Sequence, residues 1–185
     1  MRCFTALPVS DETQKQVGAL VESLKPGVRG RVSWVAPQNL HFTLQFFGEI
    51  EPAQADALAA AMEPTIADIA PFSMAYGELG AFPNERHPSV IWLGLRRGAE
   101  EMEALKTALD RAIAATNVRF DQKKFHPHLT LARVREARIH WGDTRAKVTA
   151  EDTTSEVLLM QSTLTPSGSI YSPYRRLSFG VTARG

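Results

Sequence analysis

The stretch that decides the fold is HFTL at residues 41–44, because it returns as HLTL at residues 128–131. Each copy follows a β-prone segment and an amphipathic helical segment. Phe4 lies 37 residues before His41, and Ile91 lies 37 residues before His128. This equal spacing predicts an internal duplication in which a pseudo-twofold axis relates the two copies.

The segments around the two copies predict strands alternating with helices. After Ser10, a typical N-cap, apolar residues recur at helical spacing until Pro26. A second helix is predicted from Pro52 to about Pro64, and a third from Ala99 to Thr116. Strands are predicted at residues 2–7, 32–35, 41–47, 72–80, 89–95, 128–134 and 156–165, and at 177–181 after a turn at 166–168.

Each repeated strand presents a histidine and a threonine on one face. Side chains alternate along a strand, so His41 and Thr43 point to one side, as do His128 and Thr130. Two strands lying side by side would gather two imidazoles and two hydroxyls in one groove. One neutral and one protonated histidine suit acid–base catalysis near pH 7, and hydroxyls can bond the oxygens of a phosphoryl group. The pattern therefore predicts in-line displacement at phosphorus.

These motifs resemble the 2H phosphoesterase superfamily, and within it the bacterial RNA 2′,3′-cyclic phosphodiesterases, historically called 2′-5′ RNA ligases. The resemblance implies an α+β fold in which residues 1–185 form one domain of two similar lobes, with two antiparallel sheets lining a central cleft and helices outside. It covers almost the whole chain, through FTALP, NLHFTLQFFGEI, VIWLGL, FHPHLTLAR and LMQSTLTPSGSIY.

The resemblance also implies an activity and a set of site residues. It implies hydrolysis of a terminal 2′,3′-cyclic phosphate on RNA to a 2′-phosphate, without metal or other cofactor. By resemblance, His41 is the proton donor and His128 the proton acceptor, while Thr43 and Thr130 bind the substrate. The residues alone leave the two histidine roles open, because the motifs are nearly symmetric. The expected partners are RNA ends or small cyclic nucleotides, with no obligate protein partner.

Three further residues are weaker candidates. Strict alternation puts Phe47 on the face of His41, where it could stack on a base, although a core aromatic is the commoner explanation. The same rule turns Arg133 away from His128, so Arg133 would reach a phosphate only if the strand twists or ends early. His126 and His128 form H-P-H, but no neighbouring carboxylate or cysteine completes a metal site. The three tryptophans are expected in the core or at its rim: Trp34, Trp92 and Trp141.

Composition restricts the class of partner. The 185 residues carry 21 Lys and Arg against 20 Asp and Glu, a net charge of +1. Such a balance argues against a protein that holds long nucleic acid mainly by a global positive field. Charge is uneven, however, since residues 48–85 hold seven acidic and no basic residues, whereas residues 119–147 hold eight basic and three acidic ones. The basic segment is either a solvated surface or lies near an anion site.

The single cysteine, Cys3, cannot form an internal disulfide and fits a reducing compartment. No apolar run reaches the 18 residues of a membrane-spanning helix, and the first residues do not form a signal peptide. We therefore expect a cytoplasmic monomer that does not associate with membranes. Three alternatives remain open from sequence: reversible 2′-5′ ligation at the same site, a non-catalytic module that binds RNA ends or nucleotides, and metal-dependent hydrolysis through H-P-H.

Overall fold

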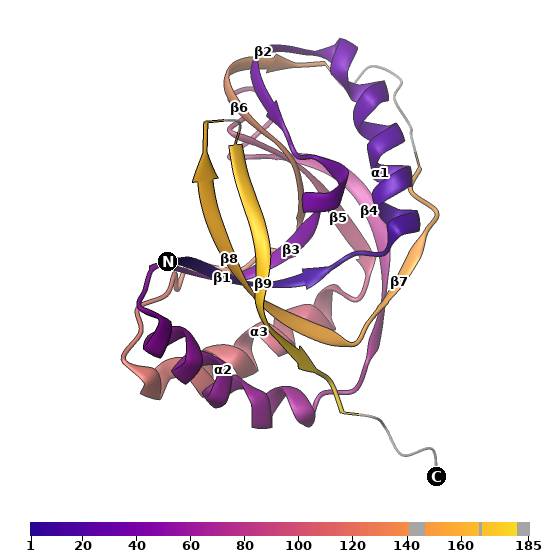
Figure 1. The fold of residues 1–185 in the computed structure, drawn as a ribbon. Helices are drawn as coiled ribbons and strands as arrows, with labels where there is room; N and C mark the ends of the chain where they lie inside the picture. Colours follow the sequence, from indigo (N-terminus) through magenta and orange to yellow (C-terminus); the bar gives the residue numbers. More distant parts are fainter. Residues whose placement is uncertain (141–146, 167, 181–185) are drawn as a thin grey trace.

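The computed structural model describes residues 1–140, 147–166 and 168–180 (Figure 1). Trp141, the centre of the predicted turn at 166–168 and the end of the strand predicted through Val181 lie outside these residues. Among the described residues, no helix is both long and apolar enough to cross a membrane.

The described strands form one curled antiparallel sheet in the order β7-β4-β5-β6-β3-β1-β8-β9, with β2 paired to β6. The prediction of an α+β fold built on antiparallel strands is confirmed, but the two expected sheets are joined into one continuous sheet, because β3 pairs with β6. The strands are β1 Arg2–Pro8, β2 Val28–Trp34, β3 His41–Glu49, β4 Phe72–Phe82, β5 Val90–Arg97, β6 Leu129–Ile139, β7 Glu151–Thr154, β8 Glu156–Thr165 and β9 Gly168–Ser178.

The two motif strands, β3 and β6, lie at the middle of the sheet. They are joined by a single residue pair, Phe42 with Leu129, and both side chains are fully buried. One arm of the sheet continues from β3 to β1, β8 and β9, and the other from β6 to β5, β4 and β7. Because so little pairing links the arms, the sheet curls at this junction and the two motifs lie side by side (Figure 1).

The helices cover the outside of the sheet. They are α1 Asp11–Leu24, α2 Pro52–Ala67 and α3 Ala99–Ile113, the last followed by a 3₁₀ turn over Ala114–Thr116. Helices α2 and α3 pack on each other below the sheet in the view of Figure 1, whereas α1 lies beside β7. As predicted, Ser10 caps α1, its hydroxyl accepting a bond from the N–H of Thr13 at 3.2 Å.

Helix α2 does not stop near Pro64 as predicted but continues for about one turn to Ala67. Proline removes one backbone donor from a helix and crowds the preceding turn. Ile66 lies beyond Pro64 and is fully buried in the core. Burying such a side chain stabilises the fold by roughly 1.5–3 kcal/mol, which is comparable to the cost of the proline.

Each motif strand contains a β-bulge at the third residue after its histidine. In the pairing of β3 with β1, Leu44 has no counterpart, and in the pairing of β6 with β5, Leu131 has none. A bulge adds one residue to a strand and therefore shifts the alternation of the side chains beyond it.

The strand registers align Phe4 with Val90, since these residues pair with the equivalent positions of the two motif strands. The repeat is thus offset by one residue from the Phe4–Ile91 correspondence that equal spacing suggested.

Candidate active site

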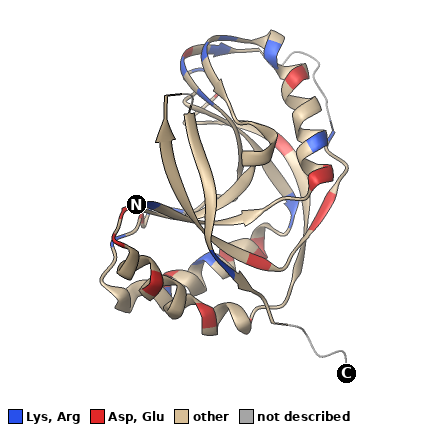
Figure 2. Cartoon of the chain, in the orientation of Figure 1, with Lys and Arg blue, Asp and Glu red and all other residues tan. Residues whose placement is uncertain are grey.

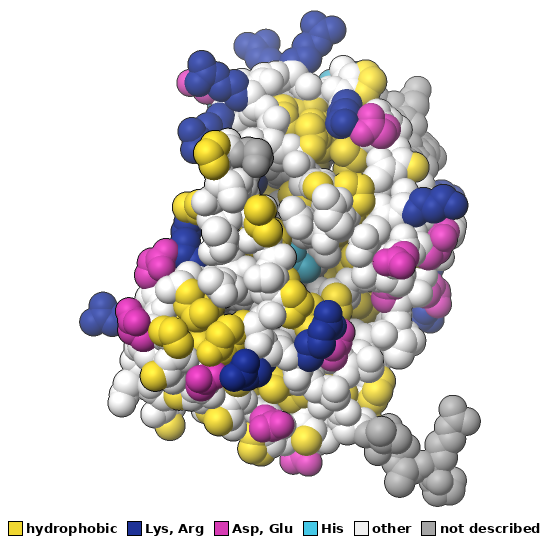
Figure 3. Space-filling view, viewed as in Figure 1, with side chains coloured by type: hydrophobic (Ala, Val, Ile, Leu, Met, Phe, Trp, Pro, Cys, Tyr) yellow, Lys and Arg dark blue, Asp and Glu magenta, His cyan; other side chains and the backbone are white. Residues whose placement is uncertain are grey.

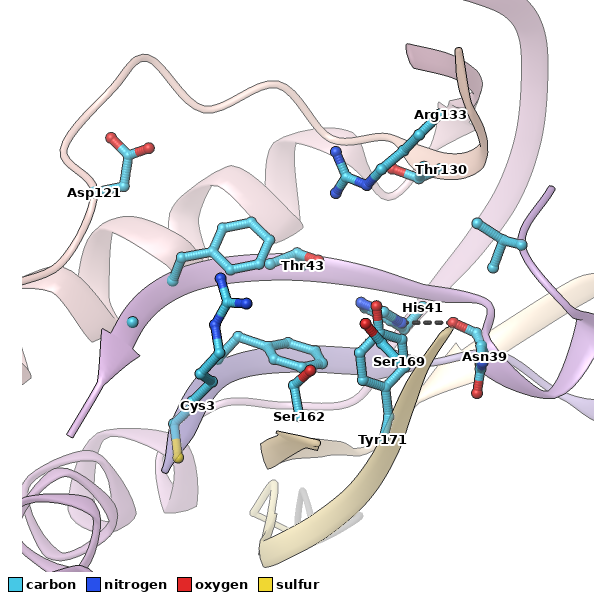
Figure 4. Close-up of a pocket in the computed structure, with 15 residues that line it drawn as sticks. Cys3, Asn39, His41, Thr43, Asp121, Thr130, Arg133, Ser162, Ser169 and Tyr171 are labelled. Atoms are coloured by element: carbon cyan, nitrogen blue, oxygen red, sulfur yellow. Dashed lines mark hydrogen bonds between the residues drawn. The ribbon is translucent and has the colours of Figure 1, made fainter. Parts of the chain in front are cut away.

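A cleft opens where the two arms meet, and we call it the motif cleft. One part is a cavity of about 460 Å³ lined by His41, and the adjoining part is a cavity of about 340 Å³ lined by His128. The motif cleft therefore brings together the four residues that the repeat singled out (Figure 4 shows the part around His41). Five residues wall both parts: Thr43, Phe46, Asp121, Thr130 and Arg133.

The two histidines make matching hydrogen bonds. Nδ1 of His41 lies 2.7 Å from the carbonyl oxygen of Asn39, and Nδ1 of His128 lies 2.7 Å from that of His126. A carbonyl oxygen only accepts hydrogen bonds, so Nδ1 carries the proton in both rings. Nε2 is therefore the nitrogen that each neutral imidazole offers to a substrate as a base, and the one that donates when the ring is protonated.

Burial lowers the pKa of both histidines. For His41 the loss of hydration is the main cause, partly opposed by its bond to the Asn39 carbonyl, and the charges of Arg133 and His128 lower its pKa further. For His128 burial again dominates, opposed by the bond to the His126 carbonyl, while nearby positive charge on His126 and Arg133 adds to the lowering. Both rings are therefore mainly neutral at pH 7 when the cleft is empty.

Aromatic side chains hold each imidazole in place. The ring of Phe4 lies 5.0 Å from that of His41, and Tyr171 approaches His41 edge-on at 5.4 Å. On the other side, Phe82 meets His128 edge-on at 5.0 Å. Such pairs restrict ring rotation and exclude water from one side of each histidine. The positions of both imidazoles are thus fixed by packing as well as by hydrogen bonds.

The threonines and Arg133 face one another across the cleft. Figure 4 shows Thr130 and Arg133 extending from β6 toward Thr43 and His41 on β3. Strict alternation would have turned Arg133 away from the site. The bulge at Leu131 reverses its direction, so Arg133 lines both parts of the cleft. Two hydroxyl groups and one guanidinium can therefore surround an anion between the histidines.

The expectation that Phe47 shares the face of His41 is wrong. Phe47 is only 7% exposed and belongs to the hydrophobic core, whereas Phe46 is 50% exposed and lines both parts of the motif cleft. The bulge at Leu44 is the reason, because it shifts the alternation by one residue between Thr43 and Phe46. Phe46 and Arg133 occupy equivalent positions, each five residues after its motif histidine.

Sequence reasoning missed several residues that line the cleft. Ser162, Ser169 and Tyr171 come from the β8–β9 hairpin, which folds over the part of the cleft that contains His41 (Figure 4). The signal that could have found them is the STLTPSGSIY stretch, which contributed to the family resemblance but was given no role in the site. Their approach depends on the pairing of β8 with β1.

A buried polar chain supports β3 from behind. The side-chain amide of Gln45 donates to Asp110 at 3.1 Å, and Asp110 accepts from Lys106 at 2.5 Å, while the hydroxyl of Thr5 donates to Gln45. Gln45 and Lys106 are 1% and 5% exposed, so these bonds are needed to offset their loss of hydration. Gln45 directly follows the bulge residue Leu44, and the chain therefore anchors the bulge to α3.

The residues around H-P-H do not assemble a metal-binding cluster within the part of the chain that the structure describes. The ring of His126 packs against Phe82 and Trp92 at 5.5 and 5.0 Å. Asp121, the carboxylate at the cleft, accepts a hydrogen bond from the backbone N–H of Lys123 and forms an ion pair with the Lys123 side chain at 3.3 Å. That backbone bond is the main cause that lowers the pKa of Asp121.

Comparison with known proteins agrees with this geometry. The chain is 33% identical to an RNA 2′,3′-cyclic phosphodiesterase of Archaeoglobus fulgidus, with 95% of this chain and 98% of the relative covered. It is 31% identical to the protein of that name from Aquifex aeolicus, over 91% and 94% of the two chains. The crystal structure of Escherichia coli LigT complexed with 3′-AMP superposes on this chain with a TM-score of 0.79, at 25% identity over 96% of this chain and 97% of that chain.

The family of LigT-like phosphoesterases matches two adjoining segments of this sequence, residues 7–92 and 93–171. Each segment contains one motif histidine and one motif threonine. Together the two segments span most of the chain, including both motif strands, strand β8 and the start of β9. The chain belongs to the LigT-like phosphoesterase family.

Proposed function

We propose that this protein is an RNA 2′,3′-cyclic phosphodiesterase that hydrolyses a terminal 2′,3′-cyclic phosphate to a 2′-phosphate in the motif cleft. The observation that carries the proposal is the matched Nδ1–carbonyl bond of His41 and His128, which leaves two Nε2 atoms for one substrate. The two relatives named RNA 2′,3′-cyclic phosphodiesterase support the substrate class. The 3′-AMP complex of E. coli LigT supports a nucleotide as the group that enters such a cleft.

The proposed reaction uses one histidine as acid and the other as base. Nε2 of His128 accepts a proton from water as the water oxygen forms a bond to phosphorus. The bond from phosphorus to O3′ breaks, and Nε2 of His41 donates a proton to O3′. The product is a 2′-phosphate with a free 3′-hydroxyl. The assignment of His41 as donor and His128 as acceptor comes from the family resemblance, since both rings have the same tautomer.

We propose that three hydrogen-bond donors stabilise the negative charge of the transition state. The hydroxyls of Thr43 and Thr130 and the guanidinium of Arg133 line the wall that both parts of the cleft share. Negative charge grows on the non-bridging oxygens during attack, and fixed donors in a partly buried site stabilise that charge. Phe46, on the same wall, is the proposed platform for a base, in place of Phe47.

Replacing either histidine tests the proposal. With an RNA oligonucleotide ending in a 2′,3′-cyclic phosphate, His41→Ala and His128→Ala should each lower kcat by about 10²–10⁴-fold. Thr43→Val and Thr130→Val should each lower kcat about 10²-fold. His87→Ala is the matched control, because His87 is an exposed loop histidine that lines neither part of the cleft. Wild-type turnover in the double histidine variant would exclude the mechanism.

The products distinguish the alternatives. Phosphorus NMR should show a 2′-phosphomonoester and no 3′-phosphomonoester, with turnover unchanged after dialysis against EDTA. Loss of activity on chelation would indicate metal-dependent hydrolysis instead. When a second RNA with a 5′-hydroxyl is added, a ligated strand exceeding the hydrolysed product would favour 2′-5′ ligation. Binding of the oligonucleotide without any turnover would favour a non-catalytic module.

We further propose that residues 1–185 act as one domain, as a monomer and in the cytoplasm. Both motif strands contribute to a single cleft, which supports one domain. The lone cysteine supports a reducing compartment. Light scattering of the purified protein should give the mass of one chain, and a single cooperative unfolding transition should follow both arms of the sheet.

A further inference from the structure

Two strands that extend from the motif cleft carry arginines opposite one another. In the pairing of β2 with β6, Arg29 lies opposite Arg138, Arg31 opposite Arg135, and Ser33 opposite Arg133. Directly paired residues of antiparallel strands project from the same face. All five arginines are exposed, so one face of this ribbon is a row of positive charge. We call it the arginine ribbon.

The other face of the same strands is apolar and faces the core. Val28, Val32 and Val134 pack there. A bulge around Glu136, whose φ is 52°, keeps Arg138 on the outer face although it lies three residues beyond Arg135. Gly30 lies opposite this bulge, where a Cβ would come within 2.6 Å of the backbone of Ala137. The backbone is therefore shaped so that both arginine pairs point outward together.

Positive charges placed this close together repel one another. Among the described residues, no ion pair involves an arginine of the ribbon, and the exposed Glu136 at the bulge is the one carboxylate on these two strands. Like charges placed directly opposite in a sheet destabilise it. A row of arginines without ion-pair partners is suited to binding a polyanion, because the phosphates would supply the missing negative charge.

The ribbon leads directly into the motif cleft. Arg133 belongs both to the ribbon and to the wall of the cleft, and at the far end Arg29 and Arg138 line an open depression of about 650 Å³. The strand from Arg133 to Arg138 spans about 15 Å at roughly 3.3 Å per residue. Figure 2 shows Lys and Arg positions along β2 and β6 at the upper end of the molecule, and Figure 3 shows Lys and Arg side chains gathered at that end.

We propose that the arginine ribbon binds the sugar–phosphate backbone of the RNA strand whose cyclic phosphate enters the motif cleft. This inference rests on the proposed function and deepens it, because it makes a polynucleotide end, rather than a small cyclic nucleotide, the preferred substrate. At about 3.4 Å per stacked nucleotide, the ribbon matches roughly four nucleotides upstream of the reacting end. The cleft takes the terminal phosphate, and the ribbon takes the phosphates that precede it.

The test compares a long and a short substrate in a variant that lacks one arginine pair. In Arg31→Gln/Arg135→Gln, kcat/KM for an eight-nucleotide RNA ending in a 2′,3′-cyclic phosphate should fall about tenfold, while kcat/KM for 2′,3′-cyclic AMP stays unchanged. The slope of log kcat/KM against log salt should flatten by about 0.7 for each lost phosphate contact. For the wild type, kcat/KM should rise with RNA length up to about five nucleotides and then level off.

The matched control is Arg175→Gln/Arg176→Gln, which changes the net charge equally. These exposed arginines of β9 pair with Asp56 and Glu156 and do not line the cleft. An equal loss in both double variants would mean that only net charge matters and would overturn the proposal. So would a loss on cyclic AMP as large as that on RNA, or no loss on either.

A second measurement separates this proposal from the proposed function. Anisotropy of a labelled eight-nucleotide RNA ending in a 3′-phosphate reports binding without turnover. If the wild-type protein hydrolyses neither substrate, the proposed function fails, yet a tenfold weaker binding in the Arg31/Arg135 variant would still support the ribbon. Unchanged RNA binding in this variant would overturn the proposal. It would also be overturned if sedimentation showed a dimer for the wild type and a monomer for the variant, because the ribbon would then bind a second copy of the chain.

Discussion

A histidine becomes a defined acid or base when something fixes which ring nitrogen carries its proton. In this chain a main-chain carbonyl performs that task for both His41 and His128. Many catalytic histidines depend on a carboxylate for the same purpose, and a carboxylate raises the pKa of the ring. A carbonyl is neutral, so burial and nearby positive charge dominate, and the pKa of both histidines is lowered.

The lowered pKa values predict a pH profile. One histidine must be protonated and the other neutral, so kcat/KM, which reports the free enzyme, should be bell-shaped with its maximum below pH 6.5, the ordinary histidine pKa. A bound phosphodiester anion stabilises the imidazolium form, so the kcat profile should be displaced to higher pH. Initial rates from pH 4.5 to 9 would check both. A kcat/KM maximum above pH 7.5 would contradict this account.

Phe46 and Phe47 provide a matched pair of substitutions. Phe46→Ala should raise KM for RNA about tenfold, because stacking on a base contributes about 1–3 kcal/mol, and should change stability by less than about 1 kcal/mol. Phe47→Ala empties a site in the core and should lower the free energy of unfolding by about 3–5 kcal/mol. Urea denaturation and steady-state kinetics on both variants check this. If the bulge were absent, Phe46→Ala would lower the stability and Phe47→Ala would raise KM.

At the scale of the strand, the bulges explain what sequence could and could not predict. The histidine and threonine of each motif lie before the bulge, so the alternation rule correctly placed the two residues of each motif on one face of their strand. Phe46 and Arg133 lie after the bulges, and the same rule therefore placed both side chains on the wrong face of their strands. The bulges become visible only in the burial pattern of the structure, in which Gln45 and Ala132 directly follow Leu44 and Leu131 and are buried like them. Two successive buried residues are incompatible with a regular half-buried strand.

Most elements followed from local pattern, whereas contacts between distant segments did not. The Ser10 cap and the strand Glu156–Thr165 were predicted from local sequence and are confirmed. The short strand β7 was missed because four residues carry too little periodicity, and it forms only by pairing with β4. The opposition of β2 and β6 arginines was equally invisible, because register between strands about 100 residues apart is set by tertiary packing.

The polar chain behind β3 predicts a specific stability effect. Asp110→Ala would leave buried Lys106 and Gln45 without an acceptor and should lower the free energy of unfolding by about 2–4 kcal/mol. Asp110→Asn keeps an acceptor oxygen and should cost less. Glu22→Ala removes an exposed ion pair with Lys25 and should change stability by less than about 0.5 kcal/mol. Equal losses from Asp110→Ala and Glu22→Ala would contradict the chain's role.

The arginine ribbon predicts a gain in stability from a substitution that harms binding. Arg31→Thr removes the repulsion with Arg135 and introduces a β-branched residue on an exposed strand. We expect the free energy of unfolding to rise by up to about 1 kcal/mol. Chemical denaturation of Arg31→Thr and of Arg176→Thr, whose arginine is paired with Glu156, would compare the two; only the former should be stabilised.

At the scale of the whole molecule, the site exists only when both arms of the sheet are in place. Each arm supplies one histidine, one threonine and one residue beyond a bulge, and a single pair, Phe42 with Leu129, joins them. Folding must therefore bury both imidazoles against the same junction. The stability of the protein is consequently linked to the protonation of His41 and His128.

This linkage has a definite sign. In the unfolded chain both histidines have a pKa near 6.5, and in the folded protein it is lower. As pH falls below about 6.5 the unfolded state binds protons first, so the free energy of unfolding decreases until the lowered folded pKa values are reached. Each unit of lowering contributes about 1.4 kcal/mol. Urea denaturation at pH 8, 7, 6 and 5 should show a smaller decrease in a His41→Phe/His128→Phe variant than in the wild type or in His87→Ala.

The bonds from the two imidazoles to the carbonyls of Asn39 and His126 have a consequence for how the protein can vary over time. Every amino acid carries the same carbonyl group, so substitutions at positions 39 and 126 change a side chain but retain the acceptor. The position of the proton on each ring therefore depends on the path of the main chain and not on the side chains at positions 39 and 126. Substitutions at both positions can therefore change side chains near the cleft without changing which ring nitrogen of His41 and His128 carries the proton.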